Sequence, residues 1–201
     1  MPSHAVIRNS AFVTYLLSLL YDSWSFPETR FQATTWGLVV HTLFFGSSSE
    51  GARRLLHGPS FFYAHSVLAG WLQLTYANPT IDTTDKVERW GVSVPFGLAR
   101  TFVVHVATVL AHWHLLRQKG GAPRGRKGSA SLLDALLRDV GPQLAILLSY
   151  KALYPNLATT YGVKSMSNDA LHNWQTACIA AITALVLPAW TKALRAGSTA
   201  K

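Results

Sequence analysis

Three long stretches of the chain contain no Asp, Glu, Lys or Arg, and they constrain the fold more than any other feature. They cover residues 31–49, 55–81 and 170–191 and are 19, 27 and 22 residues long. A helix needs about 20 apolar residues to cross the hydrocarbon core of a bilayer. Only 13% of the whole chain is charged, about half the share usual in a soluble domain. The sequence therefore predicts an all-α, multi-pass transmembrane helical bundle and argues against a water-soluble enzyme.

Charged residues, glycines and prolines divide the chain into six apolar segments. We place these segments at residues 10–26, 31–48, 60–78, 95–116, 141–159 and 170–191. Pro59 falls at an expected segment edge, where a proline costs a helix least. We expect a single integral-membrane helical domain over residues 1–201 with about six spans, a basic loop at 117–130 and a polar tail at 192–201.

The basic residues are sorted along the chain in a way that favours an even number of spans. With six spans, 12 Lys and Arg lie on the side of both termini and five on the other, with Lys151 left inside the fifth segment. Positively charged short loops tend to stay on the cytoplasmic or matrix side. Five tryptophans near segment ends are expected to anchor the helices at the two membrane interfaces: Trp24, Trp36, Trp113, Trp174 and Trp190.

The net charge of +9 does not indicate nucleic-acid binding. The basic loop is rich in glycine and lacks interleaved aromatic residues on which bases could stack. We expect it to set the topology and to contact lipid headgroups or a partner subunit. The residues expected to make these contacts are Arg117, Lys119, Arg124, Arg126 and Lys127.

Several polar side chains fall inside the apolar segments, where burial is costly and polar groups often have a function. Four of them are histidines, namely His41, His65, His105 and His112. We expect them to form hydrogen bonds between helices, and no cofactor is expected. A pair of them from facing helices could instead hold a haem b iron. Lys151 is expected to pair with a partner's carboxylate or with a backbone carbonyl.

A threonine and a histidine on separate helices leave one enzymatic possibility. A hydroxyl can act as a nucleophile when an imidazole takes its proton, and the substrate would be an ester held in the bilayer. With six spans, the second and fourth segments run in the same direction. Thr34 and His105 then enter from the same side, each within a few turns of the start of its segment. We name these two residues as the candidate catalytic pair.

The run RFQATTWGLVVHTLFFG, from Arg30 to Gly46, resembles the second-helix signature of the androgen-induced-gene-product family of six-span intramembrane threonine hydrolases. Tyr154-Pro155 resembles that family's Tyr-Pro turn. The resemblance implies Thr34 as nucleophile, a base on the fourth helix, and fatty acid esters of hydroxy fatty acids as substrates. The family carries an Asn-His pair and then His-Thr before a proline on that helix. This chain has no such proline, and His105 takes the base position only after a shift of about two residues.

The sequence favours a non-catalytic accessory subunit of a larger membrane complex, in an organellar energy-transducing assembly. This interpretation rests on the departure from the family's histidine motif and on the pI near 10, and it predicts membrane lipids and other membrane subunits as partners. The mitochondrial inner membrane fits it best, whereas the endoplasmic reticulum fits the alternative hydrolase. A haem b protein is the third hypothesis.

Overall fold

The computed structural model describes residues 4–25, 33–81, 83, 87–88, 91–117, 131–153 and 155–199. Every regular element in these residues is a helix, as predicted. The elements are α1 (His4–Ser25), α2 (Ala33–Gly46), α3 (Glu50–Ala77), α5 (Val94–Thr101), η2 (Phe102–Ala107), α6 (Thr108–Arg117), α7 (Leu132–Ala135), η3 (Leu136–Val140), α8 (Gly141–Leu153), α9 (Leu157–Thr160) and α10 (Asn168–Thr199).

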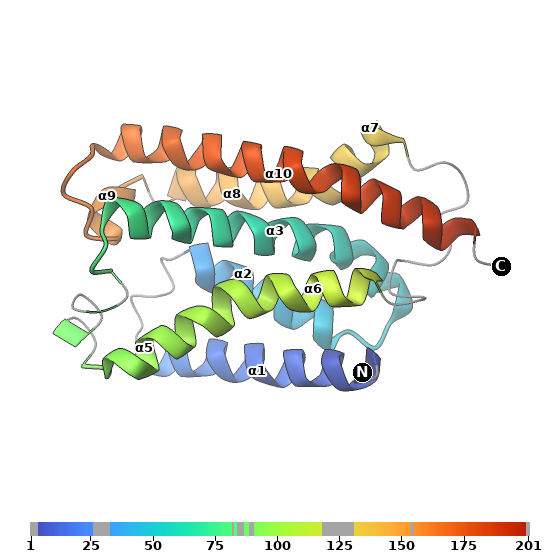
Figure 1. Ribbon diagram of the computed structural model, residues 1–201, viewed down its shortest axis with the longest axis horizontal. Helices are drawn as coiled ribbons and strands as arrows, with labels where there is room; N and C mark the ends of the chain where they lie inside the picture. The colour runs from blue at the N-terminus through green and yellow to red at the C-terminus, as the bar shows by residue number, and fades with distance from the viewer. Residues whose placement is uncertain are drawn as a thin grey trace.

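The long helices lie roughly side by side in one bundle (Figure 1). In this view α8 and α10 form one side, α1 forms the other, and α3 runs between them with α2 and α6. The turns η2 and η3 are π-helical and continue into their neighbours, so α5, η2 and α6 make one unbroken helix and α7, η3 and α8 make another. The start of α1 and the end of α10 lie toward the same end of the bundle.

Each of the six predicted segments overlaps one long helical stretch of the described residues, but several predicted boundaries were wrong. The third helix begins at Glu50 rather than near residue 60, because Ser49 caps it by accepting a hydrogen bond from the amide of Ala52. Pro59 therefore lies inside α3 and not at its edge. The polar tail expected at 192–201 is helical as far as Thr199. Charged residues end an apolar run, but they do not end a helix.

The fifth helix differs most from its predicted range of 141–159. It begins at Leu132, where Ser131 accepts a hydrogen bond from the amide of Asp134, and it ends at Leu153. Lys151 therefore lies exposed in the last turn of α8 rather than near the middle of a span. A lysine at a helix end can extend its charged group toward water, which removes the need for a buried partner.

Among the described residues, two helices are long and apolar enough to cross a membrane, Val94–Arg117 and Asn168–Arg195. The described part of the second helix, α2, has only 14 residues, which is shorter than the roughly 20 that a span needs. A count of six spans therefore stays a prediction.

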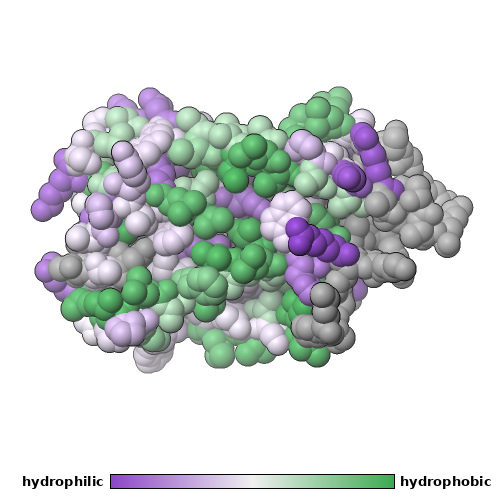
Figure 2. All heavy atoms as spheres, viewed as in Figure 1, coloured by the Kyte–Doolittle hydropathy of each residue, from purple (hydrophilic) through white to green (hydrophobic). Residues whose placement is uncertain are grey.

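Large hydrophobic side chains are exposed on several helices. Trp24 is 90% exposed, Leu185 75% and Leu17 59%. Figure 2 shows hydrophobic side chains spread over the middle of one face, and most of the strongly hydrophilic ones toward its two ends. Exposed apolar area on this scale is unusual for a monomeric soluble protein and is typical of a surface that meets lipid or another protein.

The interior between α3, α6 and α10 is largely aromatic. Phe61, Phe62 and Trp190 are fully buried there and pack against each other. Trp190 was expected to be an interfacial anchor, but it instead donates a 2.7 Å hydrogen bond to the buried carboxylate of Asp139. The π-turn η3 brings this carboxylate so close to α3 that a Cβ at Gly58 would lie 2.4 Å from the Asp139 Cβ.

Two glycines of α3 offer a matched test of this packing. Gly58→Ala should lower the free energy of unfolding by about 1–3 kcal/mol, because the added methyl group overlaps with Asp139. Gly51→Ala should raise it by up to about 1 kcal/mol, because a Cβ there meets nothing closer than 3.7 Å and alanine is the better helix former. Unfolding in detergent, followed by circular dichroism, measures both. Equal effects of the two substitutions would contradict this packing.

Candidate functional site

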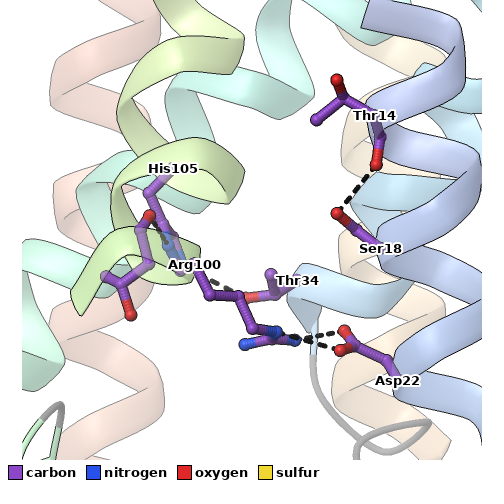
Figure 3. A network of polar contacts seen from close by, with 7 residues as sticks. Thr14, Ser18, Asp22, Thr34, Arg100 and His105 are labelled. Atoms are coloured by element: carbon purple, nitrogen blue, oxygen red, sulfur yellow. Dashed lines mark hydrogen bonds and ion pairs between the residues drawn. The ribbon is translucent and has the colours of Figure 1, made fainter. Parts of the chain in front are cut away.

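The structure brings the candidate catalytic pair into contact. Thr34 is the second residue of α2 and His105 lies within η2, and the Thr34 Oγ1 is 3.3 Å from the His105 Nε2 (Figure 3). The two residues are separated by 71 positions in the sequence. The His105 side chain is buried at 7% exposure, and its ring packs against Trp71 with 5.3 Å between the ring centroids.

A second hydrogen bond decides which nitrogen of His105 carries the proton. The Nδ1 lies 2.9 Å from the carbonyl oxygen of Thr101, and a carbonyl can only accept. The Nδ1 is therefore the protonated nitrogen, and the Nε2 presents its lone pair to Thr34. The Thr34 hydroxyl then donates to the Nε2, which is the arrangement of a hydroxyl nucleophile and an imidazole base oriented by a third group.

The helix around His105 is not an ordinary α-helix. Residues 102–107 form the π-turn η2, in which backbone hydrogen bonds run from residue i to i+5. Residues five apart then lie roughly above one another, whereas in an α-helix they point about 140° apart. Arg100 precedes His105 by five positions, so the π-turn brings both side chains toward the same side of the helix. Such turns occur frequently at functional sites.

Arg100, five residues before His105, forms a partly buried ion pair with Asp22. The Arg100 Nε donates to the Asp22 Oδ1 at 2.9 Å, and the Arg100 Nη2 donates to Oδ2. Asp22 is completely buried, whereas the Arg100 side chain keeps 14% exposure. Figure 3 shows the Arg100 side chain reaching from α5 to Asp22 on α1. Three helices, α1, α2 and α5 with η2, thus supply the polar groups of this site.

Two tyrosines fix the backbone just before Thr34. Tyr63 donates its hydroxyl to the carbonyl oxygen of Ala33 at 3.1 Å, and the amide of Ala33 donates to the Tyr161 oxygen at 3.2 Å. Burial raises the pKa of the Tyr161 phenol, so its hydroxyl stays protonated at neutral pH. Both peptide groups of Ala33 are held in this way, and the start of α2 is fixed where the nucleophile sits.

The other predicted histidines do not join this site. His41 and His112 each form a hydrogen bond with the buried hydroxyl of Ser60, at 2.8 Å and 3.0 Å. His65 donates from Nδ1 to the carbonyl oxygen of Phe61 and accepts from the Trp113 indole. These bonds match the expectation that the histidines join helices. Such arrangements are typical of packed interiors.

The haem hypothesis finds no fitting site among the described residues. His41 and His112 come from different helices, and their ring centroids lie 5.5 Å apart. Each ring already forms a hydrogen bond with the hydroxyl of Ser60. Phe44, Phe45 and Phe61 pack around His112, so a porphyrin cannot enter without rebuilding the core. In the part of the chain that the structure describes, no three His, Cys, Asp or Glu residues are grouped to hold a metal ion.

The residues expected to contact lipid headgroups or partners are mostly outside the described residues. Arg117 ends α6 with an exposed side chain that lies 5.9 Å from the centre of the Trp113 ring. Lys119, Arg124, Arg126 and Lys127 fall in the segment 118–130, which is not described. That this loop contacts lipid headgroups or a partner subunit stays a prediction.

Sequence reasoning did not connect Arg100 and Asp22 with each other or with the Thr34–His105 pair. Arg100 stood out as a charge within the fourth segment, and Asp22 as the first acidic residue of the chain. Nothing in the sequence indicated that these two residues pair, because 78 positions separate them. The π-turn also escaped notice, since sequence periodicity alone does not reveal one extra residue in a helical turn.

Searches against protein-family models, curated proteins and solved structures found no match.

The hydrogen bonds of Ser60 yield a prediction about stability. Ser60→Ala should lower the free energy of unfolding by about 1–3 kcal/mol, because it leaves two buried imidazole nitrogens without their shared partner. Ser18→Ala serves as the control, since its hydroxyl only bonds the carbonyl of Thr14 at the surface, and it should change stability by less than about 0.5 kcal/mol. Thermal unfolding in detergent compares the two. A Ser60 variant as stable as the Ser18 variant would contradict the buried bonds.

Proposed function

We propose that the chain is an integral membrane hydrolase of lipid esters, with Thr34 as the nucleophile and His105 as the general base. The observation that carries the proposal is the contact between the Thr34 hydroxyl and the unprotonated nitrogen of His105. This contact makes the hydrolase the favoured hypothesis in place of the accessory subunit, because it aligns a hydroxyl with an imidazole nitrogen that can take its proton.

The position of Thr34 at the start of α2 adds to the chemistry. The first backbone N–H groups of a helix have no acceptor within the helix, and they carry the positive end of its dipole. Negative charge that develops near Thr34 Oγ1 during attack on a carbonyl is stabilised there. The clamp of Tyr63 and Tyr161 on Ala33 keeps these groups in place.

The reaction proceeds in two balanced stages. In the first, the Thr34 Oγ1 bonds to the ester carbonyl carbon while its proton passes to the His105 Nε2. The bond to the alcohol oxygen then breaks, His105 gives that oxygen the proton, and the acyl group stays on Thr34. In the second stage a water molecule attacks the acyl carbon while His105 takes its proton. The bond to the Thr34 Oγ1 then breaks, His105 gives that oxygen the proton, and the carboxylic acid is released.

The apolar exterior supports a lipid as the substrate. In the described part of the chain two helices are long and apolar enough to cross a membrane, and one of them carries Arg100 and His105. Large hydrophobic side chains are exposed on the same helix, including Leu98 and Phe102. An acyl chain dissolved in the bilayer meets this surface directly. The resemblance of the second helix to the androgen-induced-gene-product family suggests fatty acid esters of hydroxy fatty acids as the substrate class.

Substitution of neighbouring threonines tests the proposal. Thr34→Ala should lower the turnover of a branched fatty ester by about 10³-fold or more, and His105→Gln should have a similar effect, because nucleophile and base act as one unit. Thr35→Ala is the matched control, since this buried threonine adjoins Thr34 and its side chain is not part of the Thr34–His105 hydrogen bond. Its turnover should stay within about threefold of the unsubstituted protein.

Hydrolysis is measured on the purified full chain in lipid vesicles, with the unfolding temperature of each variant recorded in parallel. Full activity in a folded Thr34→Ala protein would rule out Thr34 as the nucleophile. Loss of activity in Thr35→Ala equal to the loss in Thr34→Ala would indicate a general disturbance of α2 and would also count against the proposal.

A further inference from the structure

The attack of Thr34 on an ester turns the carbonyl oxygen into an oxyanion, and the structure offers a side chain to receive it. Arg100 forms an ion pair with Asp22, and an arginine guanidinium is a cation with five N–H donors in a planar fork. The π-turn places Arg100 one wide turn before His105. Figure 3 draws Arg100 with Asp22, Thr34 and His105 in one network of polar contacts, so the cation belongs to the same cluster as the groups that would surround the reacting carbonyl.

Asp22 holds only one edge of this guanidinium. The hydrogen bonds to Asp22 come from Nε and Nη2, which form the side of the fork. The outer edge, formed by Nη1 and the second N–H of Nη2, makes no hydrogen bond within the described part of the chain. Because the Arg100 side chain keeps 14% exposure, a small group can reach it.

The charges of the site balance throughout the reaction. At rest, Arg100 and Asp22 neutralise each other, and Thr34 and His105 are uncharged. After attack, the oxyanion and the protonated His105 form a second neutral pair. A buried arginine without a carboxylate would be strongly destabilising, so Asp22 allows a cation to be kept beside the nucleophile and fixes the direction of its free edge.

We infer that Arg100 is a third catalytic residue, which donates a hydrogen bond from its outer guanidinium edge to the ester carbonyl oxygen as that oxygen becomes an oxyanion. This role rests on the proposed hydrolase function. In the step itself, the Thr34 oxygen bonds to the carbonyl carbon, the hydroxyl proton moves to His105, and the carbonyl π electrons move onto the oxygen that Arg100 contacts. When the intermediate collapses, the electrons return and the alcohol leaves with the proton from His105.

The test removes the ion pair as a unit. The double variant Asp22→Asn, Arg100→Gln avoids a lone buried charge, and we expect its kcat to fall by about 10²–10³-fold, as is typical for the loss of an oxyanion donor. The KM should stay within about threefold, because the donor acts mainly on the transition state. The matched control is Glu50→Gln, Arg54→Gln, which removes an exposed ion pair of α3 and should leave kcat unchanged.

A pair of inhibitors separates catalysis from a structural effect. A long-chain trifluoromethyl ketone forms a reversible tetrahedral adduct with a hydroxyl nucleophile and mimics the oxyanion, whereas the ether of the same chain length mimics only the bound lipid. In the unsubstituted protein the ketone should bind far more tightly than the ether. In the Asp22, Arg100 variant this ratio of affinities should fall by about the same factor as kcat. Arg100→Lys, which keeps the charge but not the fork, should reduce the ratio by at least about tenfold.

The outcomes distinguish this inference from the proposed function. If the ratio of ketone to ether affinity is unchanged in a folded Asp22→Asn, Arg100→Gln variant, the role of Arg100 alone is overturned. If this double variant does not fold, an unchanged ratio in Arg100→Lys overturns the role in the same way. An unsubstituted protein that neither hydrolyses the ester nor binds the ketone more tightly than Thr34→Ala does would overturn the hydrolase function, and the role of Arg100 with it.

Discussion

Polar groups buried between apolar helices must find partners inside the protein, and this constraint organises the whole bundle. A buried hydrogen-bonding group without a partner costs about 1–3 kcal/mol, and an unpaired charge costs more. Many buried polar groups of the described interior meet the constraint with bonds that join distant helices. Asp22 accepts hydrogen bonds from Arg100, and Asp139 accepts one from the Trp190 indole. The Ser60 hydroxyl forms hydrogen bonds with both His41 and His112.

The contact between Thr34 and His105 satisfies the same constraint but has a different consequence. The histidines around Ser60 are enclosed by aromatic rings, so their bonds only hold helices together. Thr34 is instead the second described residue of α2, and His105 has its proton held on Nδ1 by the carbonyl oxygen of Thr101. The same type of hydrogen bond therefore builds structure at one level of the bundle and aligns a nucleophile with a base at another.

The sequence predicted the helical class, six helical segments and the Thr34–His105 pair as a possibility, because long charge-free runs and residue types can be read locally. It did not predict the starts of α3 and the fifth helix, since serine caps extend helices well beyond the apolar runs. It also missed the Asp22–Arg100 ion pair and the π-turn. Both depend on how distant helices pack, and a hydrophobic pattern carries no information about which charged residues meet. Lys151 was misplaced for the related reason that the end of α8 was set too late.

The central claim is that Thr34 forms a covalent bond with the acyl group of its substrate. Mass spectrometry of the full chain, quenched with acid within the first turnovers on a branched fatty ester and then digested, tests this claim most directly. The peptide that contains Thr34 should gain the mass of the acyl group, with fragment ions that place it on Thr34, and the gain should be absent in Thr34→Ala. Turnover without any acylated Thr34, or acylation that persists at another residue in the Thr34→Ala protein, would contradict it.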